Sequence, residues 1–141
     1  LQGKVEEAIE YYTKTLKKWP HPIIHNDIGL LLFREEKIEE ALFHFNQALQ
    51  LRPNFIEAHN NIGAILMWQG KFNEAIAHYK EAVRIKPGYA EAHANLAKAY
   101  YNTKQYDLAA MHAGRAQEIG FELGPDLLNL LNDLHPSGVI Q

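Results

Sequence analysis

The sequence repeats itself at an interval of 34 residues, and this period limits the folds open to the chain more than any other feature. Residues 25–29 (His-Asn-Asp-Ile-Gly) return at 59–63 (His-Asn-Asn-Ile-Gly) and again at 93–97 (His-Ala-Asn-Leu-Ala). Further in-phase alanines follow in each unit, at Ala41, Ala75 and Ala109 and at Ala48, Ala82 and Ala116. A period of this length is typical of proteins that stack one supersecondary unit on the next.

The repeat divides the chain into successive segments. We expect three full units at 22–55, 56–89 and 90–123, preceded at 3–21 by a segment that matches only the second half of a unit. Pro125 opens a leucine-rich stretch, and proline suits the first turn of a helix because its missing donor would be unsatisfied there. We therefore expect a capping helix within 124–136, followed by a tail at 137–141.

Each unit has the pattern of two amphipathic helices. Apolar residues recur three or four positions apart, as in 62–66 and again in 72–83. Gly70 lies between these two stretches, and glycine can take the left-handed conformation that closes a helix. Pro53 and Pro87 mark unit ends, because proline cannot donate the hydrogen bond of a helix interior.

With its in-phase Ile/Leu, Gly/Ala, Phe/Tyr, Ala and Pro positions, the sequence resembles the tetratricopeptide repeat family over about residues 3–123. The resemblance implies an all-α fold, a right-handed α-solenoid of antiparallel helix hairpins. The small residues allow the two helices of a unit to approach closely; they are Gly29, Gly63, Ala41 and Ala75. The chain departs from the family at its in-phase histidines, which stand where tryptophan is frequent, and at Ala113-Gly114.

The resemblance also implies a binding surface, because in this family the first helix of each hairpin lines a concave peptide-binding groove. The expected groove residues are Asn26, Asp27, Phe33, Arg34, Asn60, Asn61, Met67, Trp68, Asn95, Lys98, Tyr101 and Asn102. Amides can bond a peptide backbone, and aromatic rings can act as apolar platforms. The in-phase Asp27, Asn61 and Asn95 are similar to the asparagine ladder of O-linked N-acetylglucosamine transferase. The alternative is that asparagine is merely tolerated there.

A second binding mode of the family, a clamp for the C-terminal carboxylates of chaperones, uses Lys, Asn and Arg at five inner positions. Here those positions hold Asn26, Leu30, Asn61, Glu91 and Asn95. Only Asn61 fits, so we do not expect a chaperone tail as the ligand.

Composition limits the classes of partner and of metal site that we expect. The formal net charge of -3 supplies no positive field for nucleic acid or anionic lipid, so we expect neither partner. The absence of cysteine excludes disulfides and thiolate metal sites. The compartment stays open, with the cytoplasm the favoured interpretation. Residues 1–4 resemble neither a signal peptide nor an initiator start, so we expect a fragment of a longer protein.

Catalytic and metal chemistry have little support. The sequence contains no glycine-rich phosphate loop, no zinc-protease motif and no nucleophile elbow, so we expect no enzyme, no catalytic residue and no cofactor. Six of eight histidines form two in-phase columns, at His25, His59 and His93 and at His44, His78 and His112. Neighbours in one column lie a full repeat apart, beyond the ~4 Å that two ligands of one zinc can span, so we expect packing or surface positions and no metal.

Three functions remain open. The first is a protein-protein interaction module, a scaffold or adaptor that binds a peptide or protein segment. The second is a recruiting or regulatory arm of a larger enzyme such as a glycosyltransferase. The third is self-assembly, with a homo-oligomer formed through the N-terminal edge, where we expect Ala8, Tyr12 and Leu16 to lack a covering helix.

Overall fold

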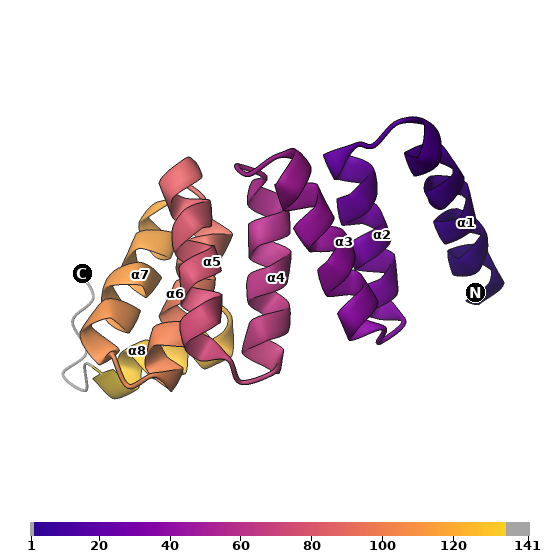
Figure 1. Ribbon diagram of the computed structural model, residues 1–141. Coiled ribbons are helices and arrows are strands. Elements are labelled where there is room, and N and C mark those ends of the chain that lie inside the picture. Colours follow the sequence, from indigo (N-terminus) through magenta and orange to yellow (C-terminus); the bar gives the residue numbers. More distant parts are fainter. Residues whose placement is uncertain (1, 135–141) are drawn as a thin grey trace. The chain divides into compact units, whose positions relative to one another are not determined.

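A computed structural model describes residues 2–134, and every regular element among them is an α-helix (Figure 1). The helices are α1 (Gln2–Lys18), α2 (Pro22–Arg34), α3 (Ile38–Leu51), α4 (Ile56–Trp68), α5 (Phe72–Ile85), α6 (Ala90–Asn102), α7 (Tyr106–Glu118) and α8 (Pro125–Leu134). The all-α fold class is thus confirmed. The expected tail at 137–141 and the last residues of the expected capping helix lie outside the described residues.

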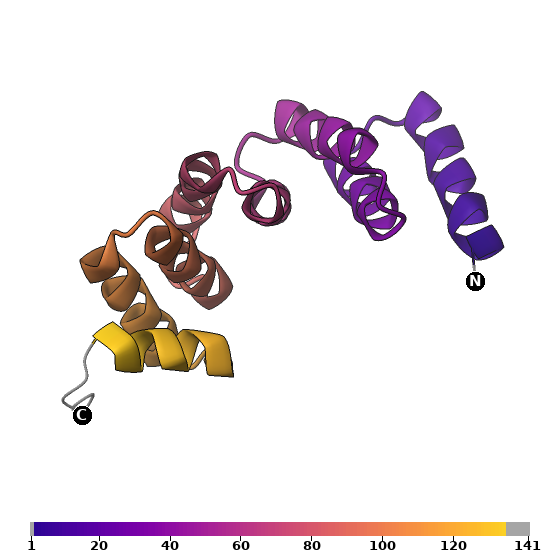
Figure 2. The same ribbon diagram turned by 90° about the horizontal axis from the view of Figure 1, so that it is seen from below.

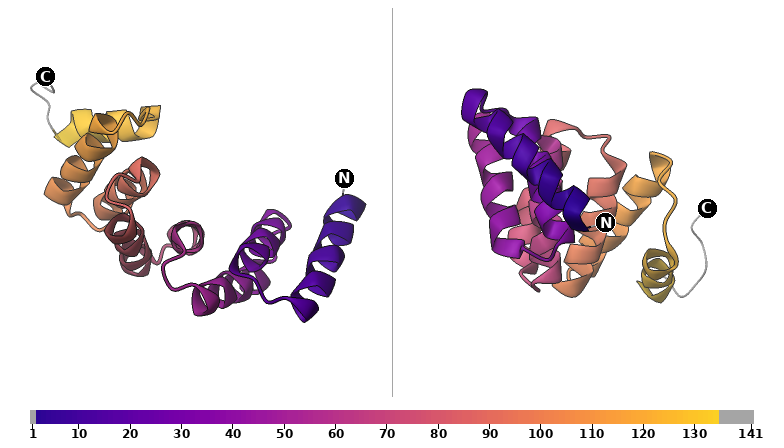
Figure 3. Two further views of the ribbon diagram at one scale, coloured as in Figure 1. Left: turned by 90° about the horizontal axis from the view of Figure 1, so that it is seen from above. Right: turned by 90° about the vertical axis from the view of Figure 1, so that its right-hand side faces the viewer.

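The chain divides into two compact units, Leu1–Ile62 and Gly63–Gln141, and the boundary falls inside α4. In the first unit α2 and α3 form a hairpin and α1 packs on α2 (Figure 3). The side chains of Ile28 and Phe45 are fully buried between these helices, and Phe55 and Ala58 continue the core into α4. Ala8, Tyr12 and Leu16 are half-buried, whereas Tyr11 is exposed.

The second unit adds α8 to a series of consecutive helices. α6 packs against both α5 and α7, and α8 lies against α6 and α7 (Figure 2). Buried Leu127 and Leu131 anchor α8, in keeping with the apolar spacing of its sequence. α8 therefore covers one end of this unit and places its own polar residues beside α6.

Each first helix ends in the same kind of turn. At Glu36, Gly70 and Lys104 the backbone is left-handed, with φ of 60°, 73° and 61°. In each turn the next residue donates a backbone hydrogen bond five residues back, as Lys71 N does to Leu66 O at 2.8 Å. This is the Schellman arrangement, which satisfies carbonyls at a helix end. The turn predicted at Gly70 is confirmed, but its two equivalents hold residues with side chains.

Close helix approach depends on a glycine facing an aromatic ring. A methyl group added to Gly29 would lie 2.7 Å from Phe45 Cε1, and one added to Gly63 would lie 2.6 Å from Tyr79 Cε1. Both rings are buried. The glycines are therefore required by packing, because each ring occupies the volume that a side chain would need.

Candidate functional site

All twelve residues expected to bind a partner lie on α2, α4 or α6, the first helices of the predicted hairpins. We call the solvent-accessible parts of these three helices the first-helix face. The first unit contributes Asn26, Asp27, Phe33, Arg34, Asn60 and Asn61, and the second contributes Met67, Trp68, Asn95, Lys98, Tyr101 and Asn102.

Asparagines in the first unit join helices together. Asn61 Nδ2 on α4 donates to Asn26 Oδ1 on α2 at 3.0 Å. Burial raises the pKa of Asp27, and a hydrogen bond from Asn26 opposes that rise. Asn26 and Asn60 are only 6% and 7% exposed. These two amides therefore offer little surface to a ligand. The Asn26–Asn61 bond gives Asn61 a structural role that the sequence did not predict.

The more accessible residues of the first-helix face are aromatic or charged. Trp68 is 72% exposed and Tyr101 is 37% exposed. Arg34, Lys98 and Asn102 are also exposed, while Asp27, Phe33, Asn61, Met67 and Asn95 are half-buried. A large exposed indole is available for contact with a partner, because burying its apolar area there would be favourable.

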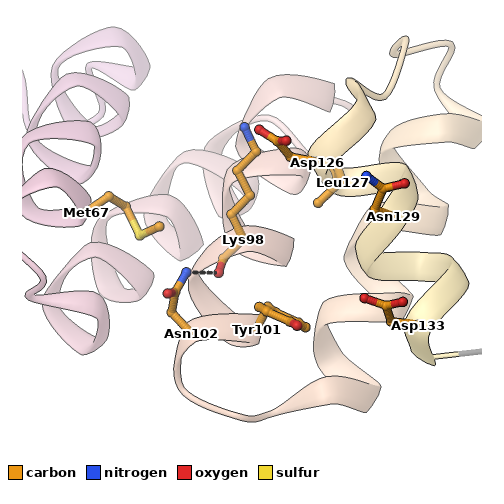
Figure 4. Close-up of a pocket in the computed structure, with 8 residues that line it drawn as sticks. All are labelled: Met67, Lys98, Tyr101, Asn102, Asp126, Leu127, Asn129 and Asp133. Carbon is orange, nitrogen blue, oxygen red and sulfur yellow. Dashed lines mark hydrogen bonds between the residues drawn. The ribbon is translucent and has the colours of Figure 1, made fainter.

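A pocket of about 430 Å³ lies in the second unit, between the end of α4, α6 and α8 (Figure 4). Four of the expected residues line it: Met67, Lys98, Tyr101 and Asn102. α8 supplies the other four, Asp126, Leu127, Asn129 and Asp133. The sequence interpretation missed these because it treated α8 only as a cap. The spacing of Asp126, Asn129 and Asp133, three and then four residues apart, was a signal that they share one helix face.

The wall that α6 contributes is held in place by local contacts. The Tyr101 ring meets the Tyr106 ring edge-on, with centroids 5.4 Å apart. Asn102 Nδ2 donates to the backbone oxygen of Lys98 at 2.8 Å, as Figure 4 shows. These contacts restrict Tyr101 and Asn102, so part of the ordering entropy that binding would otherwise cost is already lost.

Histidines pair across the α2–α3 and α6–α7 hairpins, a feature that the sequence analysis missed. His25 Nδ1 lies 3.0 Å from His44 Nδ1, and His93 Nδ1 lies 2.9 Å from His112 Nδ1. His93 Nε2 also lies 2.9 Å from Pro87 O, and a carbonyl only accepts, so this nitrogen carries a proton. In the neutral pair His93 Nδ1 must then accept from His112 Nδ1.

Burial and the neighbouring ring set the charge of these pairs. Burial lowers the pKa of His112 to about 4, with a further lowering from His93. Burial lowers the pKa of His25. Burial is also the largest cause of the lowered pKa of His44, to which His25 adds a further lowering and which Glu40 opposes. The described residues contain no group of three or more histidine, cysteine or acidic side chains placed to hold a metal. Burial therefore favours the uncharged form of His25, His44 and His112 in these links between helices.

Of the helices that the structure describes, none has both the length and the apolar character needed to cross a membrane.

Comparison with known proteins places the fold. A family model described as "TPR repeat" matches residues 29–69 and 65–104, together more than half of the chain. The first tetratricopeptide domain of Spaghetti (RPAP3), solved bound to the HSP90 peptide SRMEEVD, is similar with a TM-score of 0.74. The two share 18% sequence identity, over 80% of this chain and 89% of that one, so the likeness shows the solenoid fold alone. No curated protein matches. The chain belongs to the tetratricopeptide repeat family.

Proposed function

We propose that this chain is a non-catalytic protein-protein interaction module whose first-helix face binds a segment of a partner protein. The observation that carries the proposal is the exposure of Trp68 and Tyr101 on that face, the second of them at the rim of a pocket. Aromatic side chains of this kind most often dominate the energy of protein interfaces. Lys98 and Asn102, both exposed on the same unit as these aromatic residues, then supply polar contacts.

The partner segment is proposed to differ from an acidic chaperone tail. The structural neighbour binds an HSP90 peptide, and peptide binding by a domain of this fold supports a peptide partner here. The family clamp needs lysine and arginine at positions that hold Leu30, Glu91 and asparagines in this chain. Without these cations a doubly acidic peptide would lose its charge-assisted hydrogen bonds. The recruiting arm of a larger enzyme is one setting in which such a module would act.

The test begins with peptides selected from a random displayed library on the intact chain. The affinity of a selected peptide is then measured by fluorescence anisotropy for the Trp68→Ala and Phe43→Ala variants. Phe43 is a matched control, because it is 58% exposed but lies on α3. Trp68→Ala should weaken binding by about 2 kcal/mol, roughly 30-fold, if Trp68 is an anchor.

Phe43→Ala should leave the affinity within twofold of the unchanged chain. Loss of binding in Phe43→Ala, with full binding in Trp68→Ala, would place the partner on another surface. Self-assembly is separated in the same experiment by sedimentation of the chain without peptide, where the proposal predicts a monomer.

A further inference from the structure

The pocket in the second unit has more negative than positive charge. Its lining contains two carboxylates, Asp126 and Asp133, and one ammonium group, Lys98. The surrounding sequence strengthens this excess, since residues 121–134 include Glu122 as a third acid and contain neither lysine nor arginine. The local field would therefore favour a positive side chain in this pocket. The negative excess comes from α8, because the charges of the first-helix face alone are nearly balanced.

The charged groups of the pocket are unevenly placed. Figure 4 shows the Lys98 side chain directed toward Asp126, at the start of α8. Asp133 lies near the other end of α8, on the side toward which Tyr101 points. Within the described part of the chain Asp133 forms no ion pair. Both its carboxylate and the Tyr101 ring are exposed to solvent at the pocket. Among the described residues Asp126 forms no ion pair either, but the Lys98 side chain is directed toward it, so Asp133 is the carboxylate with no cation beside it in the pocket.

Apolar groups complete the pocket. Leu127, only 2% exposed, and half-buried Met67 are among the residues that line it. The volume of about 430 Å³ lies at the lower end of the range of small-molecule pockets, which is enough for one long side chain and part of its backbone. An aliphatic stem can lie along such apolar groups while its charged head remains near water.

We propose that this pocket receives an arginine side chain of the bound partner segment, with the guanidinium between Asp133 and the Tyr101 ring. The inference rests on the proposed function and names the chemistry of one contact within it. A guanidinium is planar, stacks on an aromatic face and bonds a carboxylate through two parallel N–H groups. An ammonium group offers only a point charge, so lysine binds more weakly than arginine.

Asp126 has a separate explanation that Asp133 lacks. Asp126 lies in the first turn of α8, where a negative charge is stabilised by the helix dipole. Asp133 lies in the last turn of the same helix, where a negative charge is disfavoured by that dipole and no basic residue accompanies it. The helix itself gains nothing from Asp133, which makes its place at the pocket the more informative of the two.

The experiment uses capped pentapeptides, acetyl-Gly-Ser-Xaa-Ser-Gly-amide, in which Xaa is arginine, citrulline, lysine or glutamate. Each is titrated into the ¹⁵N-labelled full chain, and the dissociation constant is taken from amide chemical shifts. Citrulline keeps the shape of arginine without its charge. The arginine peptide should bind at least fivefold more tightly than the citrulline peptide, shift residues of α6 and α8, and weaken when salt is raised to 1 M.

Asp133→Asn should reduce the arginine peptide to the affinity of the citrulline peptide. Asp107→Asn is the matched control, because Asp107 is an exposed acid on α7, outside this pocket. It makes the same change in net charge and should leave the affinity unaltered. Equal weakening by both variants would overturn the proposal, since a diffuse field would then explain the preference. Tighter binding of the glutamate peptide, or no preference for arginine, would also overturn it.

Failure of this inference is distinguishable from failure of the proposed function. Library-selected peptides that depend on Trp68 but ignore Asp133→Asn would leave the interaction module in place and remove the arginine contact. Selected peptides that depend on Asp133 and not on Asp107 would support both.

Discussion

Two hairpins of this chain, α2–α3 in the first unit and α6–α7 in the second, perform the same packing with different side chains. In α2–α3 the contact is made by Gly29 and the Phe45 ring. At the equivalent positions of α6–α7 stand Ala97 and Ala113, both fully buried. A small residue faces a large one in the first hairpin, and two small residues of equal size replace them in the second.

The second hairpin keeps its helix packing without the aromatic residue of the first. Loss of the aromatic ring at position 113 is accompanied by gain of a methyl group at position 97. One methyl group replaces only a small part of the volume of a phenyl ring, yet Ala97 and Ala113 are both fully buried. The features that the hairpins share, a histidine pair and a left-handed residue in the turn, do not depend on which solution is used.

The largest effect is expected when the first hairpin is given the side chains of the second. Phe45→Ala should lower the free energy of unfolding by about 3–5 kcal/mol, as ring deletions in cores do. Gly29→Ala alone should cost about 1–3 kcal/mol, because the new methyl group meets the ring at 2.7 Å. In the double variant Gly29→Ala should cost nothing, giving a coupling free energy of about 2 kcal/mol in a urea titration followed by circular dichroism.

Gly114→Ala is the control for that cycle. Gly114 lies within α7 and an added methyl group would meet nothing within 4 Å, so the change should stabilise the chain by about 1 kcal/mol through helix propensity alone. Strict additivity of Gly29→Ala and Phe45→Ala would contradict the packing account.

The histidine pairs should differ in their response to acid. The pKa of His112 is about 4 in the folded chain, against an unfolded value near 6.5, so the unfolded chain binds more protons between these values. The contribution of the uncharged His112 to the free energy of unfolding is therefore fully present above about pH 6.5 and is lost as the pH falls toward 4. His112→Gln should flatten the slope of unfolding free energy between pH 7 and pH 5. His44→Gln should flatten it less, because Glu40 opposes the lowering of the His44 pKa.

An unchanged slope in His112→Gln would contradict this account, as would a larger flattening in His44→Gln than in His112→Gln. The comparison is made on slopes because either substitution also removes a helix contact.

The smallest effect concerns the turns. Glu36 and Lys104 hold left-handed backbone with φ of 60° and 61°, which costs roughly 1–2 kcal/mol for a residue with a Cβ. Glu36→Gly and Lys104→Gly should each stabilise the chain by about 0.5 kcal/mol after the greater freedom of unfolded glycine is counted. Gly70→Ala should destabilise it by a similar amount. Thermal melts of the three variants check this, and a lower melting temperature for either glycine variant would show that the side chain makes a compensating contact.

Much of the fold could be predicted from the sequence, because the 34-residue period repeats local signals. Helical spacing of apolar residues, proline near helix ends and glycine at the turn each act within a few residues. The small residues that allow close helix approach were found in the same way. The match to the family and to a solved domain of the same fold confirms that part of the interpretation.

Contacts between helices were harder to predict. His25 and His44 are 19 residues apart, and Asn26 and Asn61 are 35 apart, which are neither helical spacings nor one repeat period. Such pairs depend on the rotation of each helix about its axis, and side-chain identity alone does not fix that rotation. The α8 wall of the pocket was missed for another reason. The buried Leu127 was enough to predict a capping helix, and no function was assigned to the polar residues of that helix.

The measurement that most directly tests the account is a chemical-shift map of a library-selected peptide bound to the ¹⁵N-labelled chain. The account predicts that the largest shifts fall on α2, α4 and α6, including the Trp68 indole and the Tyr101 amide, with α8 shifted where its carboxylates line the pocket. Phe43 on α3 and Met111 on α7, both exposed, should remain unmoved. A map centred on α3, α5 and α7, with Trp68 and Tyr101 unchanged, would contradict the central claim that the first-helix face binds the partner.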